Sequence, residues 1–298
     1  MGSRLQWEEV QLNSCASKPV KGTTFGQLPL ANESQKPRPA VTFTHLHQPS
    51  VPSTNVWALS WLKEHGLNGP TLFTADGQTA GQGQRDKSWS TRHGEDLSMS
   101  LALPVQSGWT PPIFNMAVAL SFRASLEHLR PPRAAKTKVQ IKWPNDILLT
   151  QEGSSRKCAG MLVENVWRGA SWSATVVGVG VNVNSDRRTS PFHATSLRDA
   201  WGISLKPQEV GHLLAHDLLE QLARPMHPTS ILRGFKGHLF GLGELRSFDL
   251  DGQTRQGVLS DVDEQGRARY SWTDLGQEEW LQSGDVTWRF EDAVQNRD

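Results

Sequence analysis

The segment KWPND, residues 142–146, gives the strongest local indication of the fold. The preceding KVQIKW alternates apolar and polar residues, which predicts a half-buried strand. Pro144 interrupts that strand and keeps Trp143 out of the helical region. Asn145 and Asp146 therefore lie at a turn just past a strand end, where a lysine, an amide and a carboxylate meet. Such a turn fits a charged site, and it equally fits a structural turn in which Asp146 only caps backbone amides.

The segments before this turn predict two helices and two strands. VPSTNVWALSWLKEHG begins with Ser53 or Thr54 as N-cap and stops at Gly66. Its predicted apolar face consists of Val56, Leu59, Trp61 and Leu62. GPTLFTAD predicts a strand, and DLSMSLALP predicts a half-buried strand with Leu97, Met99, Leu101 and Leu103 on its inner face. PPIFNMAVALSFRASLEHLRP is apolar nearly all round at first, which predicts a central buried helix.

The segments after the turn complete a mixed layer of helices and strands. CAGMLVENVW and SATVVGVGVNVN predict strands, and the second is β-branched enough to be buried on both faces. A helix over residues 207–223 is predicted from the stripe Val210, Leu213, Leu214, Leu218 and Leu222. From about Leu245, short alternating segments separated by DG, DEQG and LGQEE predict a small β-barrel.

Composition limits the classes of partner. The 298 residues carry a formal net charge of +1, so no global attraction to nucleic acid or to a membrane surface is expected. No run of about 20 apolar residues predicts a transmembrane helix. Cys15 and Cys158 lie far apart in the sequence, which leaves a disulfide open but favours two free thiols in a reducing cytoplasm. The ten histidines show no ligand spacing, so a structural zinc site is not expected.

Residues 1–40 are polar and rich in Pro, Ser, Gly and Lys, which predicts a disordered or loosely attached arm. A helix-turn-helix would need two periodic apolar helices within this stretch. The sequence contains none, so specific DNA binding is not expected.

Seven segments, in order along the chain, resemble the biotin protein ligases. They are PSTN (52–55), ADGQTAGQGQRDKSW (75–89), KWPND (142–146), KCAGMLVE (157–164), GVGVNVN (178–184), TSL (195–197) and the β-rich tail. The resemblance implies an α+β fold, with a mixed, mostly antiparallel sheet flanked by helices, as in class II aminoacyl-tRNA synthetases and biotin ligases. It implies an arm at 1–40, a catalytic biotin- and ATP-binding domain at 41–240 and an SH3-like barrel at 243–292.

The implied activity is that of an ATP-dependent ligase. It would convert biotin and ATP, with Mg²⁺, to biotinyl-5′-AMP and transfer biotin to a lysine of a biotin carboxyl carrier protein or domain. A biotin-dependent carboxylase, such as acetyl-CoA carboxylase, is the implied source of that carrier. No membrane partner is expected, and a homodimer is left open.

The same resemblance implies the site residues. The reacting set is Lys157, Lys142 and Asp146, with Asp146 also as a Mg²⁺ ligand. The biotin-binding set is Ser53, Thr54, Asn55, Gln78, Gly81, Gln82, Gly83, Gln84, Lys157 and Gly160. The ATP and adenylate set is Gln84, Arg85, Lys87, Trp89, Asn145 and Asn182.

Physical chemistry supports these roles but leaves structural alternatives. Small polar side chains suit the neutral ureido head of biotin, although Ser53 or Thr54 could instead only cap a helix. A lysine at position 157 would neutralise charge in the adenylation transition state, although without the resemblance it is a solvated loop lysine. Asn182, within an apolar strand, must find a hydrogen-bond partner. Cys158 has no evident base and is expected to be a small buried side chain.

The loop GQGQRDKSW departs from the family pattern GRGRxGRxW. Gln82, Gln84 and Lys87 stand at its three arginine positions, and Asp86 stands at its glycine. A neutral hydrogen bond in place of a charged one loses roughly 1 kcal/mol or somewhat more, so weaker retention of the adenylate is expected.

Three alternatives follow from the sequence. A lipoate ligase shares the adenylation logic, but KWPND argues against it. A catalytically weakened, biotin-binding relative is suggested by Gln84 and Asp86 and opposed by Lys142, Asp146 and Lys157. A bifunctional ligase and repressor would need the helix-turn-helix that residues 1–40 lack.

Overall fold

A computed structural model describes residues 41–290, except for residues 86, 106, 191, 192 and 226. The predicted arm, Cys15 and Asp86 lie outside the described residues. None of the helices in the described part is both long and apolar enough to cross a membrane.

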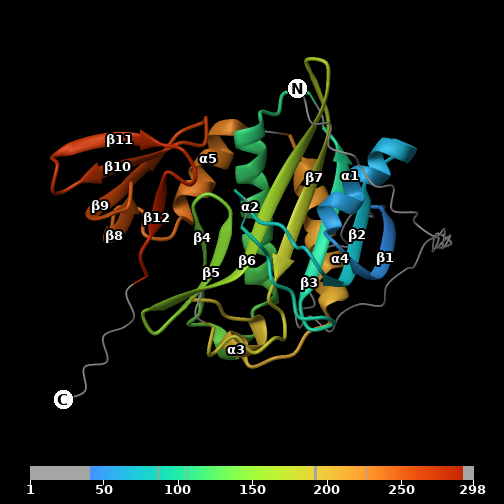
Figure 1. Cartoon of the computed structure of the whole chain (residues 1–298), viewed down its shortest axis with the longest axis horizontal. Helices are drawn as coiled ribbons and strands as arrows, with labels where there is room; N and C mark the ends of the chain where they lie inside the picture. Colours follow the sequence, from blue (N-terminus) through green and yellow to red (C-terminus); the bar gives the residue numbers. More distant parts are fainter. Residues whose placement is uncertain (1–40, 86, 106, 191–192, 226, 291–298) are drawn as a thin grey trace, which may run out of the picture.

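The central element is a seven-stranded sheet with the strand order β1-β2-β3-β7-β6-β5-β4 (Figure 1). Only β1 and β2 are parallel, and every other neighbouring pair is antiparallel. The strands are β1 (Thr44–Val51), β2 (Thr71–Gln78), β3 (Leu97–Pro104), β4 (Lys138–Lys142), β5 (Asp146–Gln151), β6 (Ser154–Arg168) and β7 (Ser171–Val181). The predicted mixed, mostly antiparallel sheet is confirmed.

Helices cover both faces of this sheet. On one face α1 (Thr54–His65) packs over Phe73, Ala102 and Val176. On the other face lie α2 (Pro111–Leu129), α4 (Pro207–Leu222) and α5 (Pro228–Gly237), and α2 is the buried helix that the sequence predicts. A 3₁₀ turn (Pro132–Ala134) and the short α3 (Leu197–Trp201) complete the helical elements of the described chain. The sequence did not predict β1, β5, α3 or α5.

Two predicted faces differ from the structure. Strand β3 is buried on both faces from Leu97 to Leu103, because helices lie on either side of the sheet, so the half-buried assignment is wrong. On α1 the predicted apolar face is partly wrong, since Val56 is 41% exposed. The buried face of α1 is instead small and polar at its start and consists of Thr54, Asn55, Ala58 and Leu62.

The C-terminal strands form a second, all-antiparallel sheet in the order β11-β10-β9-β8-β12. They are β8 (Leu245–Leu250), β9 (Gln253–Val262), β10 (Ala268–Trp272), β11 (Gln277–Leu281) and β12 (Val286–Trp288). The buried aromatic side chains Phe248, Tyr270, Trp272 and Trp288 form their core. The small all-β module is confirmed, and its closure into an SH3-like barrel stays a prediction.

Candidate active site

A cavity of about 370 Å³ opens on the α1 face of the large sheet, beside the start of α1. Successive residues of β7 point to opposite faces, so Gly178 and Gly180 face this side while their valine neighbours face α2 and α4. The predicted site residues that line the cavity are Ser53, Thr54, Asn55, Gln78, Gln82, Gly83, Gln84, Arg85, Lys87, Trp89, Lys142, Asn145, Asp146, Lys157 and Gly160. Gly81 and Asn182 do not line it.

The charged end of the cavity is built at the KWPND turn. Lys142 ends β4 and pairs in register with Asp146, which begins β5. Asp146 Oδ2 accepts from Lys142 Nζ at 3.3 Å, and Oδ1 lies 2.7 Å from Lys157 Nζ on β6. Asp146 therefore joins two lysines: the turn alone predicted its pairing with Lys142, and Lys157 is added from β6.

The two lysines determine the charge of Asp146. Burial alone would raise the pKa of this carboxyl, but the charges of Lys142 and Lys157 and their hydrogen bonds outweigh burial and hold the pKa below its usual value. The group is therefore an ionised carboxylate between two ammonium groups. The two ammonium groups and the carboxylate together carry one net positive charge, and such a site suits a phosphate.

Lys157 is fixed by its backbone and its side chain. Its N–H donates to the carbonyl of His193, and its carbonyl accepts from the N–H of Thr195. The ammonium group lies 5.3 Å from the ring centre of Trp89, and the side chain is 35% exposed. It is thus part of a strand and an ion pair, and the solvated-loop alternative does not describe it.

The opposite end of the cavity is polar and carries no positive charge. Thr54 N–H donates to Gln78 Oε1 at 2.8 Å, and Thr54 Oγ1 lies 2.8 Å from Ser100 Oγ. Ser100 Oγ also lies 2.6 Å from Asn55 Oδ1. Asn55 Nδ2 donates to Glu164 Oε2 at 2.6 Å. Ser53 occupies the N-cap position of α1, but its side chain makes no cap bond. Neither Ser53 nor Thr54 therefore serves only as a cap.

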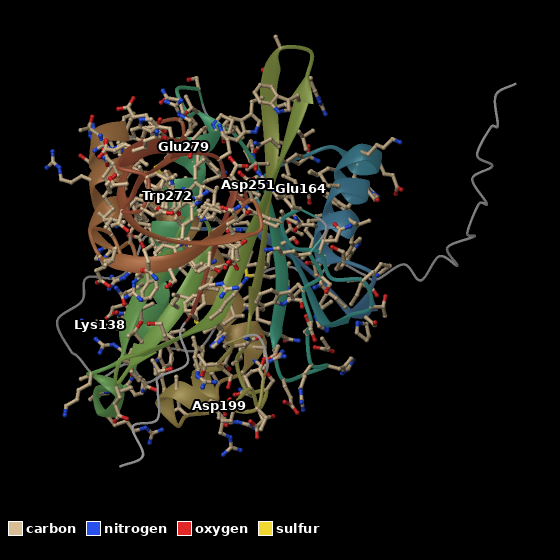
Figure 2. All side chains as sticks on the ribbon, turned by 60° about the vertical axis from the view of Figure 1, so that its left-hand side comes forward. Lys138, Glu164, Asp199, Asp251, Trp272 and Glu279 are labelled. Atoms are coloured by element: carbon tan, nitrogen blue, oxygen red, sulfur yellow. The ribbon has the colours of Figure 1, made fainter. Side chains whose placement is uncertain are left out.

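The sequence missed Ser100 and Glu164, which hold Thr54 and Asn55 from the neighbouring strands. Ser100 is fully buried on β3, and Figure 2 labels Glu164 on β6. A signal for Ser100 existed, since serines alternate with apolar residues within LSMSLALP on a strand that has no solvent-facing side. Glu164 has no such signal, because one acidic residue in a strand normally faces water.

The Gly-rich loop folds back on itself at the cavity mouth. Trp89 N–H donates to Gly81 O at 2.9 Å, and Gly83 N–H donates to Lys87 O at 2.6 Å. Gly81 thus shapes the loop through its backbone. Trp89 lies over Gly180, where any Cβ would overlap the indole, and its Nε1 is buried without a hydrogen-bond partner among the described residues.

The tip of the same loop contacts the turn between β11 and β12. Ser283 Oγ donates to Gln84 Oε1 at 3.2 Å, and the guanidinium of Arg85 lies 3.6 Å from Asp285. Gly284 leaves room for that guanidinium. The cavity is also lined by Ser283, Gly284, Val286, Thr287 and Trp288, so the second sheet forms one of its walls, which the sequence did not predict.

Two asparagines and a cysteine have structural contacts. Asn145 Nδ2 donates to the carbonyl of Met161 at the cavity wall. Asn182 is buried, and its Nδ2 donates to Thr195 O at 3.1 Å, so it holds the segment before α3. Cys158 is buried, and burial raises the pKa of its thiol far above the usual range, as expected for a packing residue.

A protein-held Mg²⁺ finds little support at Asp146. Both of its oxygens are engaged by lysine ammonium groups, and it is the only acidic residue lining the cavity in the described chain. A single carboxylate suits a cation that arrives with substrate phosphates rather than a cage made by the protein. The one group of three potential ligands in the described chain, His216, Asp217 and Glu220, lies on α4 and does not line the cavity.

Comparisons with known proteins agree with this geometry. Residues 48–182 match the model of the biotin/lipoate A/B protein ligase family. The bifunctional ligase/repressor BirA of Bacillus spizizenii is 28% identical over 237 residues, which are 74% of this chain and 67% of the relative. The biotin–[acetyl-CoA-carboxylase] ligase of Paracoccus denitrificans is 35% identical over 171 residues, which are 55% of this chain and 66% of the relative. The chain thus spans about two thirds of the length of these relatives.

A solved structure extends the likeness to the fold. The biotin protein ligase of Aquifex aeolicus, in complex with biotin and ATP, aligns with a TM-score of 0.64 at 24% identity. The alignment covers 83% of this chain and 99% of that one. The family model spans the first helix, the Gly-rich loop, the KWPND turn and the strand of Lys157. The chain belongs to the biotin/lipoate A/B protein ligase family.

Proposed function

We propose that this protein is a biotin protein ligase, which forms biotinyl-5′-AMP from biotin and ATP and then transfers biotin to a lysine of a carrier protein. The observation that supports this most is the polarity of one cavity. Its α1 end offers neutral hydrogen-bonding groups, and its KWPND end offers Lys142 and Lys157 bridged by Asp146. Biotin has the matching polarity, with a neutral ureido head and an anionic carboxylate.

In the first step a biotin carboxylate oxygen bonds to the α-phosphorus of ATP. The bond from this phosphorus to the oxygen that bridges the α- and β-phosphates breaks, and pyrophosphate leaves. Lys142 and Lys157 lie where they can neutralise the charge that gathers on the phosphoryl oxygens. Asp146 holds both ammonium groups in place before ATP arrives. Mg²⁺ is proposed to enter with ATP and to screen the phosphates, and its coordination by Asp146 stays a prediction.

In the second step the amine of the carrier lysine attacks the carbonyl carbon of the mixed anhydride. The bond from this carbon to the AMP oxygen breaks, AMP leaves, and the amine loses its proton as the amide forms. Water competes for the same carbon, so the loop at residues 81–89 must shield it. Trp89, which already lies over Gly180 beside Lys157, is proposed to pack on the adenine.

The carrier is proposed to be a biotin carboxyl carrier protein or domain of a biotin-dependent carboxylase. The name of the Paracoccus relative supports an acetyl-CoA carboxylase as its source. We further propose a catalytic domain over residues 41–240, an SH3-like domain over 243–292 and the cytoplasm as the compartment, where Cys158 stays a free thiol. The roles of Asn182 in nucleotide binding and of a homodimer stay predictions.

A lipoate ligase is the main rival within the family. Lipoate has an apolar dithiolane ring where biotin has its ureido group, so it would gain nothing from a polar wall. The hydrogen-bonding groups that Thr54 and Gln78 present to the cavity would then face an apolar ring, at a cost for each group left unpaired. Biotin is therefore the better fit.

The test combines substrate choice with one variant. The protein is incubated with ATP, Mg²⁺ and either biotin or lipoate, and the modified lysine of an unmodified carrier domain is sought by mass spectrometry. Lys157→Ala should lower biotin-dependent ATP–pyrophosphate exchange roughly 100-fold or more, because it removes a charge that stabilises the transition state. Lys138→Ala is the control, because Lys138 is an exposed lysine on the edge strand β4 (Figure 2).

Unchanged exchange in Lys157→Ala would overturn the assigned role of this lysine. Modification of the carrier by lipoate but not by biotin would overturn the proposed substrate. A protein that binds biotin but shows no exchange would instead be the weakened, non-catalytic relative.

A further inference from the structure

We infer that Ser100 and Glu164, which do not line the cavity, fix the direction of the hydrogen bonds that the cavity offers to the ureido head of its ligand. This inference rests on the proposed function. It makes the two residues positioning residues that select a urea against ligands with a different pattern of donors and acceptors.

The orientation of the Asn55 amide is set first. One end of this amide faces Glu164 Oε2 at 2.6 Å and the carbonyl of Leu162 at 3.3 Å. A carboxylate and a carbonyl only accept hydrogen bonds, so that end must be the NH₂ group. The oxygen of Asn55 then points to Ser100 Oγ at 2.6 Å. Asn55 itself is buried, so water cannot substitute for these partners.

The protons of Ser100 and Thr54 follow from that orientation. Asn55 Oδ1 carries no proton, so the hydroxyl of Ser100 must donate to it. A hydroxyl has one proton, so a Ser100 that donates to Asn55 can only accept in its contact with Thr54 Oγ1 at 2.8 Å. Among the described residues, the other acceptor bonded to the Thr54 hydroxyl is Gln78 Oε1 at 3.1 Å. Ser100 is the closer acceptor, and Gln78 Oε1 already accepts from the N–H of Thr54. We therefore assign the Thr54 proton to Ser100, which leaves the lone pairs of the Thr54 oxygen for the cavity.

The Gln78 amide is oriented by the backbone. The N–H of Thr54 donates to Gln78 Oε1 at 2.8 Å, which identifies that end of the amide as the oxygen. The NH₂ end then lies beside Gly81, where a Cβ would be 2.8 Å from Nε2. Both Thr54 and Gln78 line the cavity. The ligand therefore meets an acceptor from Thr54 and a donor from Gln78.

A urea satisfies both groups, because its N–H can donate to Thr54 and its carbonyl can accept from Gln78. A guanidinium has N–H donors in every in-plane direction and no acceptor, so it would place a donor against the NH₂ of Gln78. The chain of hydrogen bonds runs from the Glu164 carboxylate, which only accepts, through Asn55 and Ser100 to Thr54. We expect the donor and acceptor directions to be kept while Glu164 and Ser100 are present and to become variable when either is replaced.

The experiment compares biotin with 2-iminobiotin, in which a protonated guanidino group replaces the urea. Steady-state pyrophosphate exchange is measured for wild type, Ser100→Ala, Glu164→Leu and Glu164→Gln. Ser98→Ala is the matched control, because Ser98 is also buried on β3 and its hydroxyl bonds, among the described residues, to Thr91 Oγ1 rather than to Thr54 or Asn55. Ser100→Ala and Glu164→Leu should raise the KM for biotin about tenfold, the effect of one lost hydrogen bond, with kcat and the KM for ATP unchanged.

The same two variants should also lose most of the preference for biotin over 2-iminobiotin. Glu164→Gln should behave as wild type, because the glutamine oxygen can still accept from Asn55. If Ser100→Ala and Glu164→Leu match Ser98→Ala in an active enzyme, the inference is wrong while the proposed function stands. If kcat and both KM values change together, the residues are merely structural and the inference is again wrong. If wild type shows no exchange with biotin, the proposed function itself fails.

Discussion

At the scale of single residues, the site depends on two glycines of β7, which have no side chain to fill the cavity. Gly178 and Gly180 alternate with valines along β7, and a Cβ at Gly178 would overlap the amide of Asn55. A Cβ at Gly180 would overlap the indole of Trp89. The two glycines therefore leave space for the amide of Asn55 and the indole of Trp89. In the segment GVGV the glycines face the cavity, while the alternation itself is that of a strand.

Gly180→Ala is expected to displace Trp89 from its place over β7. Overpacking costs about 1–3 kcal/mol in a closed core, and here the displacement of a cavity residue should reduce adenylate formation roughly tenfold or more. Biotin-dependent pyrophosphate exchange measures this effect. Gly237→Ala is the control, because the space around Gly237 is open. Equal exchange in both variants would show that Trp89 is not needed where the structure places it.

The sequence could predict the charged end of the site but not the chain of hydrogen bonds that holds Asn55 at its polar end. Lys142 and Asp146 are four residues apart around a proline turn, so local geometry brings them together. Ser100 and Glu164 meet Asn55 only because β3, β6 and α1 are adjacent in the folded chain. That adjacency is a property of sheet order, which no local pattern encodes.

At the scale of elements, the edge of the sheet contains a cluster of histidines between β1, β2 and α4. His45 Nε2 bonds to Thr74 Oγ1 at 2.8 Å, and its Nδ1 lies 3.0 Å from His212 Nε2. His47 also contacts Thr74, at 3.0 Å, and lies 3.4 Å from a carboxylate oxygen of Asp76. Burial, followed by the nearby His212 and His47, lowers the pKa of His45 to about 4.

This cluster should make the native state sensitive to acid. The pKa of His45 is 6.5 in the unfolded chain and about 4 in the folded chain. Between these values the unfolded chain binds a proton that the folded chain excludes. The free energy of unfolding should therefore fall as the pH is lowered from about 6.5 towards 4, and it should gain nothing more from this group above 6.5.

Urea unfolding at several pH values tests this expectation, with His45→Gln as the comparison. The variant cannot titrate at this position, so its free energy of unfolding should depend less on pH across the same window. Asp76, beside His47, and Glu209, whose charge acts to raise the pKa of His212, are present in both proteins, so their effects largely cancel in the difference. Parallel pH curves for the two proteins would contradict the expectation.

Most element types were predictable, but their burial was less so. Alternation and caps identified α1, β2, β3, α2 and the strand before KWPND, whereas β5 after it went unpredicted. Strand β3 was assigned a solvent-facing side because its serines look polar, yet helices cover both faces of the sheet. Strand β1, with the sequence THLHQPSV, went unnoticed because it is polar and contains a proline, and it is tolerated as an edge strand.

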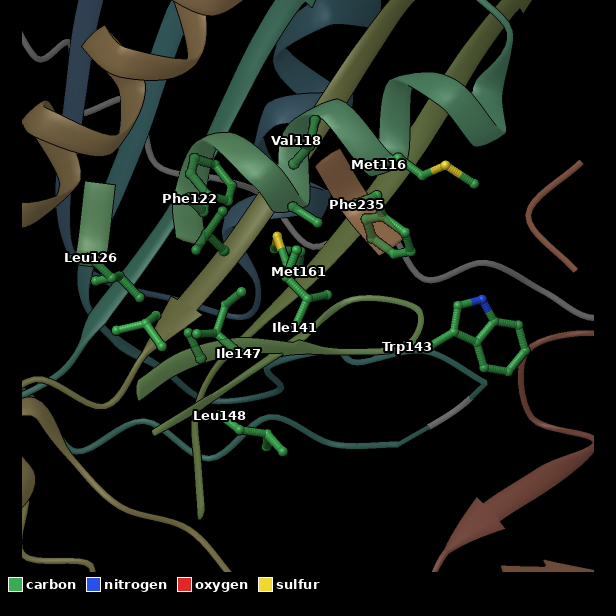
Figure 3. Close-up of a cluster of buried hydrophobic side chains, with 14 of the residues drawn as sticks. Met116, Val118, Phe122, Leu126, Ile141, Trp143, Ile147, Leu148, Met161 and Phe235 are labelled. Carbon is green, nitrogen blue, oxygen red and sulfur yellow. The ribbon is translucent and has the colours of Figure 1, made fainter. Parts of the chain in front are cut away.

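At the scale of the whole molecule, the KWPND turn also joins the two sheets. Trp143 points from the cluster around Ile141 towards the C-terminal strands (Figure 3). Its Nε1 donates to Gly266 O at 3.2 Å, and its ring meets Tyr270 edge-on at 6.5 Å. The two sheets therefore share one hydrophobic core, and the residues that place Lys142 and Asp146 also position the wall formed by the second sheet. The sequence predicted a separate β-module because strand patterns do not show which modules share a core.

Trp143→Ala should therefore affect both stability and function. Trp143 is only 3% exposed, and replacing a buried tryptophan by alanine typically costs about 3–5 kcal/mol. Trp143→Phe keeps most of the packing and loses the bond to Gly266, which should cost about 1 kcal/mol. Urea unfolding followed by circular dichroism gives both values. Because β12 lines the cavity, the KM for ATP should rise in Trp143→Ala and change little in Trp143→Phe. A Trp143→Ala protein with the stability and KM of wild type would show that the two sheets do not depend on this side chain.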